Sequence, residues 1–344
     1  MMRKPLHAAG VSCLFTTALL FAATLASAES FPRTPSGKPD FSGNYDIASL
    51  TPFERDPNLG DQLVITIEEA RQIERGADEL TAARDASIDP DRSAPAVGGN
   101  VGFYNFFWFD AGMRRFQIDG EYRTSILTDP PNGRMPPVSE AGKARRAAVE
   151  RPRDYKNTGT AWWLEEGGDP YDNPESLQLI DRCIYGGIAT VPIRPVVYNN
   201  LKTIVQTDSH VVIHIEWMHW PRIVRLDSEH APPDVRSLAG DSIGWWEGDT
   251  LVVETTNFLA VPNVPREGLK VVERFSPIDD GSILYQFAVD DPDYEAPYGG
   301  EFPWPKTTAY NYEYACHEGN YAMGNILRGA RLLEEELRQR QGDG

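Results

Sequence analysis

Glu216, His219 and Arg222 bring a carboxylate, an imidazole and a guanidinium together within seven residues of the chain. A carboxylate and an imidazole at the end of a strand can exchange a proton with a ligand, and a guanidinium just beyond can hold an anion or a carbonyl group. Histidine is scarce, with six in the whole chain. The spacing predicts Glu216 and His219 as catalytic residues and Arg222 as a substrate-binding residue. The alternative is a structural ion pair that closes a hairpin.

Two further pairs of residues suit the walls of a ligand pocket, namely Trp108 with Asp110 and Asp241 with Trp246. Indole rings stack on sugars and on flat hydrophobic ligands. We expect Trp108 and Asp110 to form a lip over the cavity, and Asp241 and Trp246 to line it. For the second pair, aromatic filling of the core is the alternative.

Glu313 lies in the run from Thr307 to Cys316, where tyrosines alternate with small or polar residues. In a strand, this alternation gives one bulky face and one small, polar face. Glu313 would then face the lumen of a barrel, where burial would raise the pKa of its carboxyl group and let it act as a general acid toward a bound substrate. A surface pair with Arg274 is the alternative.

His214, Glu216 and His219 also resemble a set of metal ligands. On a strand, His214 and Glu216 share a face while His219 points away, so we expect no metal. The chain has no phosphate loop, no GxGxxG after a strand and no CxxC. Those absences argue against the nucleotide-binding and dithiol classes, and we expect no cofactor.

The elements that must position these residues are short runs with strand character, beginning near residue 120. Asp208-Ser209 and Gly248-Asp249 are suited to hairpin turns between them. Consecutive strands joined by short turns indicate an antiparallel meander. The expected strands are 122–127, 201–207, 210–217, 222–227, 245–247, 251–255, 269–275, 283–289 and 307–316, and the expected helices are 66–83, 139–149 and 322–341.

The expected fold class is mainly β, with the meander closing into a lipocalin-like barrel and a few peripheral helices. Closure removes the unpaired edges of a long sheet. An open sandwich of two sheets fits the same pattern of strands.

Residues 1–28 have the three parts of an export signal. Arg3 and Lys4 precede an apolar stretch that ends in a small-residue cleavage site at Ala28. A membrane anchor would need about twenty unbroken apolar residues, and threonines interrupt this run. We expect a periplasmic or secreted protein whose mature part, 29–344, is a single β-rich domain with a loop-rich N-terminal third.

The net charge is −18, and it becomes −20 without residues 1–28, which contain two basic residues and no acidic one. Nucleic-acid binding needs clustered basic residues, so a small molecule is the expected partner. No later segment is long and apolar enough to span a membrane, and the pattern specifies no oligomeric state. Cys183 and Cys316 remain after cleavage, and they form either one disulfide or two buried thiols.

Four motifs resemble those of a family of exported bacterial proteins of unassigned activity. They are GDSIGWWEGDTLVVETTNF at 240–258, NFFWFDAG at 105–112, RTSILTDPPNGRMPP at 123–137 and YEYACHEGNY at 312–321. The resemblance covers most of the mature chain. Where the family reads E-x-x-H-[DE]-x-R, this chain has Trp220-Pro221 between His219 and Arg222. The resemblance implies export and the β-rich fold, and it implies no reaction.

The residues lead to two hypotheses. In the first, the protein is a cofactor-free lyase, isomerase or hydratase that acts on an aromatic, steroid-like or sugar-like compound, with Glu216 and His219 moving protons and Arg222 clamping the substrate. In the second, it is a non-catalytic, lipocalin-like protein that binds such a compound in the periplasm. The acid–base cluster favours the first.

Overall fold

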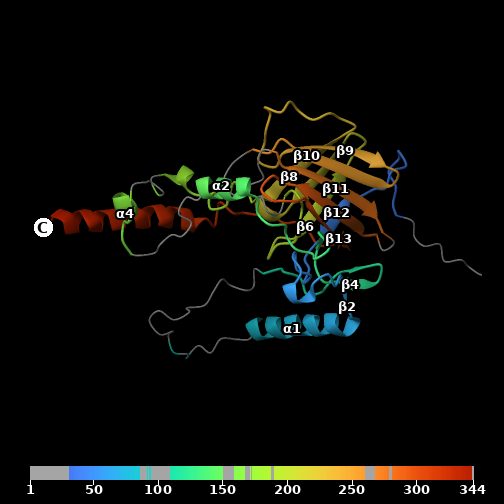
Figure 1. Ribbon diagram of the computed structural model, residues 1–344, viewed down its shortest axis with the longest axis horizontal. Helices are drawn as coiled ribbons and strands as arrows, with labels where there is room; N and C mark the ends of the chain where they lie inside the picture. The colour runs from blue at the N-terminus through green and yellow to red at the C-terminus, as the bar shows by residue number, and fades with distance from the viewer. Residues whose placement is uncertain are drawn as a thin grey trace, which may run out of the picture. The chain divides into compact units, whose positions relative to one another are not determined.

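One large β-sheet dominates the fold, with eleven strands in the order β14-β1-β6-β7-β8-β9-β10-β11-β12-β13-β5 (Figure 1). This computed structural model describes residues 31–85, 91, 93, 109–149, 159–166, 171, 173–186, 190–259, 268–278 and 281–342. The strands of the large sheet are β1 (Gly43–Asp46), β5 (Leu127–Asp129), β6 (Leu201–Gln206), β7 (His210–Ile215), β8 (Trp220–Leu226), β9 (Asp241–Glu247), β10 (Thr250–Thr256), β11 (Lys270–Pro277), β12 (Ile283–Asp290), β13 (Tyr298–Trp304) and β14 (Lys306–Thr307).

The predicted mainly β, largely antiparallel architecture is confirmed. Neighbouring strands of the large sheet are antiparallel except for β8 and β9, which are parallel with Val224 opposite Ser242. A parallel pair needs a long connection that returns the chain to the same end, and residues 227–240 provide it. The meander is therefore interrupted once.

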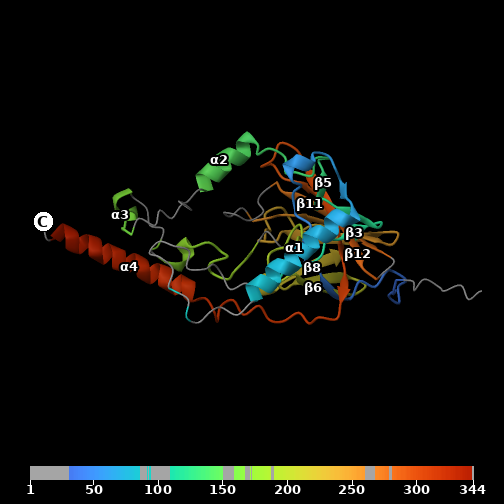
Figure 2. The same cartoon turned by 90° about the horizontal axis from the view of Figure 1, so that it is seen from below.

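The predicted helices are also confirmed (Figure 2). They are α1 (Ile67–Asp85), α2 (Glu140–Val149) and α4 (Tyr321–Gly342), with a short α3 (Trp163–Glu166) in addition. Thr66 and Glu69 form a capping box before α1, in which the Thr66 hydroxyl accepts the Glu69 N–H at 3.2 Å and the Glu69 carboxylate accepts the Thr66 N–H at 2.8 Å. A second, three-stranded sheet has β4 (Glu121–Arg123) between β2 (Val64–Ile65) and β3 (Gln117–Ile118).

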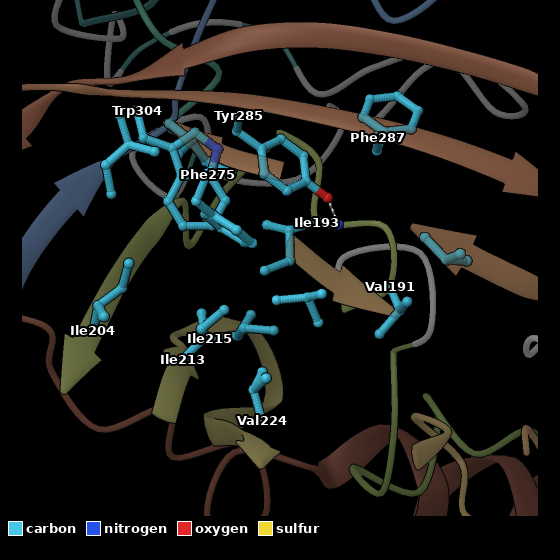
Figure 3. Packing of buried hydrophobic residues seen from close by; sticks show 14 of the residues in the cluster. Val191, Ile193, Ile204, Ile213, Ile215, Val224, Phe275, Tyr285, Phe287 and Trp304 are labelled. Carbon is cyan, nitrogen blue, oxygen red and sulfur yellow. Dashed lines mark hydrogen bonds between the residues drawn. The ribbon is translucent and has the colours of Figure 1, made fainter. Parts of the chain in front are cut away.

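Side chains from every part of the large sheet fill its buried face. Figure 3 shows Ile193 lying between Tyr285 on one side and the aliphatic side chains of Ile213 and Val224 on the other. The backbone N–H of Ile193 donates to the Tyr285 hydroxyl at 2.9 Å. Ile193 and the three residues around it are each 0% exposed, so the segment that contains Ile193 packs into the core.

The predicted strand from Thr307 to Cys316 is wrong beyond its first residue, because only Lys306–Thr307 pairs as β14. Its sole partner, β1, is four residues long and is also paired with β6. The following residues instead bond through side chains, as when Asn44 Nδ2 donates to the carbonyl of Ala309 at 2.9 Å. The alternating pattern predicted a longer strand, but after Thr307 the chain pairs with no neighbouring strand of the described sheet.

The two ends of the strand order come close along the chain. β13 ends at Trp304 and β14 begins at Lys306, so Pro305 alone separates them. β14 pairs with β1, and the N–H of Asp46 donates to the Pro305 carbonyl at 3.1 Å. One continuous segment therefore contacts both β12 and β1.

Cys183 and Cys316 form a disulfide with a Cα–Cα distance of 5.8 Å, which confirms the first of the two alternatives for these cysteines. All described residues belong to one compact unit, Phe31–Gly344. Within it, none of the described helices combines the length and apolar character needed to cross a bilayer. The predicted signal, residues 1–28, lies outside the described residues.

Candidate functional site

A buried lysine lies where β1, β6 and β7 meet. Lys202 is on β6, opposite Tyr45 of β1 and Ile215 of β7, and it is 0% exposed. Its ammonium group donates to the carbonyls of Asn199 at 3.3 Å and of Leu201 at 3.2 Å. Lysine is almost never fully buried without a charged partner, so its surroundings are informative.

The negative charges of three carboxylates act on the Lys202 ammonium group. They belong to Asp46 at the end of β1, Glu216 directly after β7, and Asp110 from a distant part of the chain. Two backbone contacts hold the Asp110 segment, because its N–H donates to the Val197 carbonyl at 2.8 Å and its carbonyl accepts from Asn200 Nδ2 at 2.6 Å. Tertiary contacts therefore bring Asp110 to the ends of the strands.

The environment moves two pKa values toward neutrality. Burial lowers the pKa of Lys202 to about 7, although the negative charges of Glu216, Asp46 and Asp110 oppose this shift. Asp110 as a residue is exposed, yet burial of its carboxyl group, followed by the charges of Asp46 and Glu216, raises its pKa to about 6. Groups with pKa values near neutrality can both take up and release protons under physiological conditions.

The cluster extends to two histidines on the other face of the strands. The rings of His214 and His219 lie edge to face with centroids 4.5 Å apart, and His214 Nδ1 is 3.0 Å from Asn311 Nδ2. Burial, followed by the positive charges of His219 and Lys202, lowers the pKa of His214. This shift favours the neutral form of His214, while His219 is exposed to solvent.

Of the predicted site residues, Glu216 and Asp110 both act on Lys202, and His219 contacts the backbone of Glu216. Glu216 and His219 are linked by backbone, since the His219 N–H donates to the Glu216 carbonyl at 2.9 Å. The Glu216 carboxylate accepts the Leu201 N–H at 3.1 Å. The anticipated direct pair of carboxylate and imidazole is therefore replaced by a wider cluster. Trp108 lies outside the described residues.

Arg222 lies apart from this cluster, inside the sheet. It is 3% exposed and donates from Nη1 to Glu273 Oε1 at 2.9 Å, with a second, shorter contact to Oε2. Thr255 and Ser242 accept further bonds from it at 2.8 and 3.1 Å, and the Tyr285 hydroxyl donates to Glu273 Oε1 at 2.6 Å. The hydrogen-bond partners of Arg222, namely Glu273, Thr255 and Ser242, are themselves buried polar groups, as in a structural network.

Ser242 stands at the centre of Gly240-Asp-Ser-Ile-Gly244, which has the spacing of a nucleophile elbow. In an elbow the serine projects from a sharp turn between a strand and a helix. Here Ser242 lies within β9, is 5% exposed and has its hydroxyl 2.9 Å from that of Thr255. It is part of the Arg222 network.

The remaining predicted site residues lie elsewhere. Asp241 accepts two bonds from Arg225 Nη2 at 3.0 Å and is 2.9 Å from His230 Nδ1. Trp246 stacks on Phe41 with ring centroids 5.7 Å apart. Glu313 is exposed. Its alternative partner, Arg274, instead donates to Glu247 at 2.8 Å.

Lys202 was missed at the level of sequence, although its signal was present. In Leu201–Gln206, alternation places Lys202 on the same face as Ile204, which is 2% exposed. A lysine on the apolar face of a strand predicts either a buried charge or a long side chain that reaches solvent. The structure shows the first.

A separate open groove runs along α1. Unlike the cluster around Lys202, its described lining has no group of charged side chains directed at one point. Glu69 is committed to the helix cap, and Arg115 Nη1 donates to the Arg123 carbonyl at 3.0 Å. Among the described residues, no group of three His, Cys, Asp or Glu side chains is arranged to hold a metal ion. The groove is lined by Leu59, Ile65, Glu69, Gln72, Ile73, Gly76 and Arg115.

Comparisons with known proteins find no matching family model, no matching curated protein and no matching solved structure.

Proposed function

We propose that this protein is a cofactor-free acid–base enzyme, a lyase, isomerase or hydratase, that acts on an aromatic, steroid-like or sugar-like compound. One observation carries the proposal. Lys202 and Asp110, whose pKa values are about 7 and about 6, influence each other within one cluster. Active sites are where burial and neighbouring charges shift pKa values in this manner.

Accessibility divides the roles within the cluster. Asp110 is exposed as a residue and its carboxyl group is only partly buried, so it is the group proposed to meet a substrate, whereas Lys202 is 0% exposed. Asp110 is therefore the proposed catalytic residue, and Lys202 is a positioning residue whose charge favours the ionised carboxylate. Burial, followed by the charges of Asp46 and then Glu216, raises the pKa of Asp110 and so increases its basicity. His219, which is exposed, is the proposed second proton carrier.

The proposed chemistry conserves protons and electrons. The ionised Asp110 removes a proton from the substrate and becomes a neutral carboxylic acid. It then returns the proton to another atom of the substrate in an isomerisation, or to the leaving group in an elimination. Proton transfer by a positioned carboxyl group contributes typically about 10² to 10⁴-fold in rate.

We also propose that the sheet closes into a barrel through the continuous segment β13-Pro305-β14, which contacts β12 and β1. The buried face carries Tyr285, Phe275 and Trp304, each at most 1% exposed. This filled interior supports an enzyme with its site at the strand ends, rather than a carrier that holds a ligand within the sheet. Export to the periplasm or beyond is proposed on the pattern of residues 1–28 and the disulfide.

The test uses the purified mature chain in D₂O with a library of aromatic, steroid and sugar compounds. An enzyme that takes and returns a proton incorporates deuterium into its substrate or converts it, and mass spectrometry detects either change. Asp110→Asn is expected to abolish the reaction. Asp208→Asn is the matched control, since Asp208 is exposed in a hairpin turn. Equal activity in wild type and Asp110→Asn, or no exchange with any compound, would overturn the proposal.

A further inference from the structure

Arg55, in the chain between β1 and β2, carries a buried positive charge that has no ionic partner among the described residues. It is 1% exposed, and no carboxylate of the described residues lies within 4.0 Å of its guanidinium. Its backbone is fixed on both sides, because its N–H donates to the Gly133 carbonyl at 2.8 Å and its carbonyl accepts from Arg134 Nη1 at 2.9 Å. The side chain is therefore held in a rigid loop environment.

Half of the guanidinium has hydrogen-bond partners and half has none. Nη1 donates to the carbonyls of Pro131 at 2.7 Å and Gly60 at 3.2 Å. Nε and Nη2 are buried and have no hydrogen-bond partner in the part of the chain that the structure describes. These two nitrogens lie along one edge of the planar group, with parallel N–H bonds. This is the edge that grips a carboxylate with two hydrogen bonds.

The charge balance around Arg55 differs from that around Arg222, which is also buried. Arg222 has Glu273 against its guanidinium. For Arg55, burial lowers the pKa and the negative charge of Asp61 acts against this from beyond ion-pair distance. A buried charge without a partner is costly, and a buried donor without an acceptor calls for an ion or a water molecule.

Gly133 packs directly against the guanidinium and leaves no room for a side chain of its own. Its φ is +64°, and a Cβ there would lie 2.9 Å from Arg55 Nε and Cζ and 2.6 Å from the Ser125 hydroxyl oxygen. Both the backbone conformation and the space favour glycine. We propose that the Nε–Nη2 edge of Arg55 binds a small monovalent anion, a halide or a small carboxylate, which neutralises the buried charge.

The test measures thermal unfolding of the full mature chain while chloride replaces gluconate at constant ionic strength. Wild type is expected to gain about 2 °C for each tenfold rise in chloride above its dissociation constant. Arg55→Met is expected to lose this dependence. Arg114→Met is the control, since it removes the same charge from a side chain that is 61% exposed. A second series with formate separates a carboxylate site from a halide site.

Crystals of the wild-type protein soaked in bromide give an independent measurement, should Arg55→Met fail to fold. An anomalous peak beside Nε and Nη2 of Arg55 would support the anion site. A water molecule there with no anomalous signal would overturn it, as would an equal chloride dependence in wild type and Arg55→Met.

Discussion

Replacing Lys202 by methionine tests the electrostatic basis of the candidate site. Methionine keeps an unbranched chain of nearly the same length, one atom shorter, without the charge. Burial lowers the pKa of Lys202 from 10.5 to about 7 in the folded protein. Between these two pH values the unfolded state binds the proton more strongly, so the charge opposes folding and its cost fades as pH rises toward 10.5.

The magnitude follows from the shift of the pKa. At pH 7 the unfavourable contribution of Lys202 is about 4 kcal/mol, and at pH 10 it is about 1 kcal/mol. The substitution also removes two hydrogen bonds, to Asn199 and Leu201, worth about 1 kcal/mol each. Lys202→Met is thus expected to stabilise the fold by about 2 kcal/mol at pH 7 and to destabilise it by about 1 kcal/mol at pH 10.

The assay is equilibrium unfolding in urea at several pH values, with the disulfide intact. Lys306→Met is the control, because Lys306 is exposed and the charge change is the same. Its difference from wild type is expected to stay constant over this window. A difference for Lys202→Met that also stays constant with pH would refute the buried-charge argument.

Three other predictions follow from the described contacts. At pH values above 6, Asp110→Asn is expected to raise the urea concentration at the unfolding midpoint, and below pH 4 it is expected to have no effect. The reason is that a carboxyl group whose pKa is raised in the folded state destabilises the fold only at pH values where it is ionised in the unfolded state. Urea unfolding at pH 4 and 7 checks this. Glu273→Gln leaves the Arg222 charge buried and unpaired, so calorimetry should show a loss of about 3 to 5 kcal/mol, and an unchanged midpoint would contradict that. The double variant Cys183→Ser, Cys316→Ser opens a link between residues 133 apart and is expected to lose about 2 to 5 kcal/mol, measured by urea unfolding against wild type with its disulfide intact.

The strands between Leu201 and Asp290 could be predicted because their signals are local, whereas β13 (Tyr298–Trp304) was not predicted. Alternation over six to eight residues and tight turns such as Gly248-Asp249 specify strands and hairpins without knowledge of the rest of the chain. The helix that follows Thr66 was predictable for the same reason, since its capping box lies within four residues. The pairing of β14 depends on which edges are free, and the local pattern does not contain that information.

The candidate site could be predicted only in part. Glu216 and His219 were recognised because they are close in sequence, but Asp110 joins them through contacts of its backbone with Val197 and Asn200. Arg222 shared that proximity and still faces the interior, because alternation in β8 places it with Val224 and Leu226. Short spacing in sequence predicts a shared site only when the side chains also leave the strand on the same face.

The single parallel pair has a consequence for how the proposed barrel can close. Going around the ring from β1 through β6–β13 and back by way of β14, the described strands make nine neighbour contacts, eight antiparallel and one, β8 with β9, parallel. Each antiparallel contact reverses the strand direction, so a ring is consistent only when their number is even. In a ring with an odd number of strands that alternate in direction, the last strand would run parallel to the first, so the closing contact could not also be antiparallel. Residues 227–240, which carry the chain back to the end where β8 began, are what give a ring of nine its consistent direction.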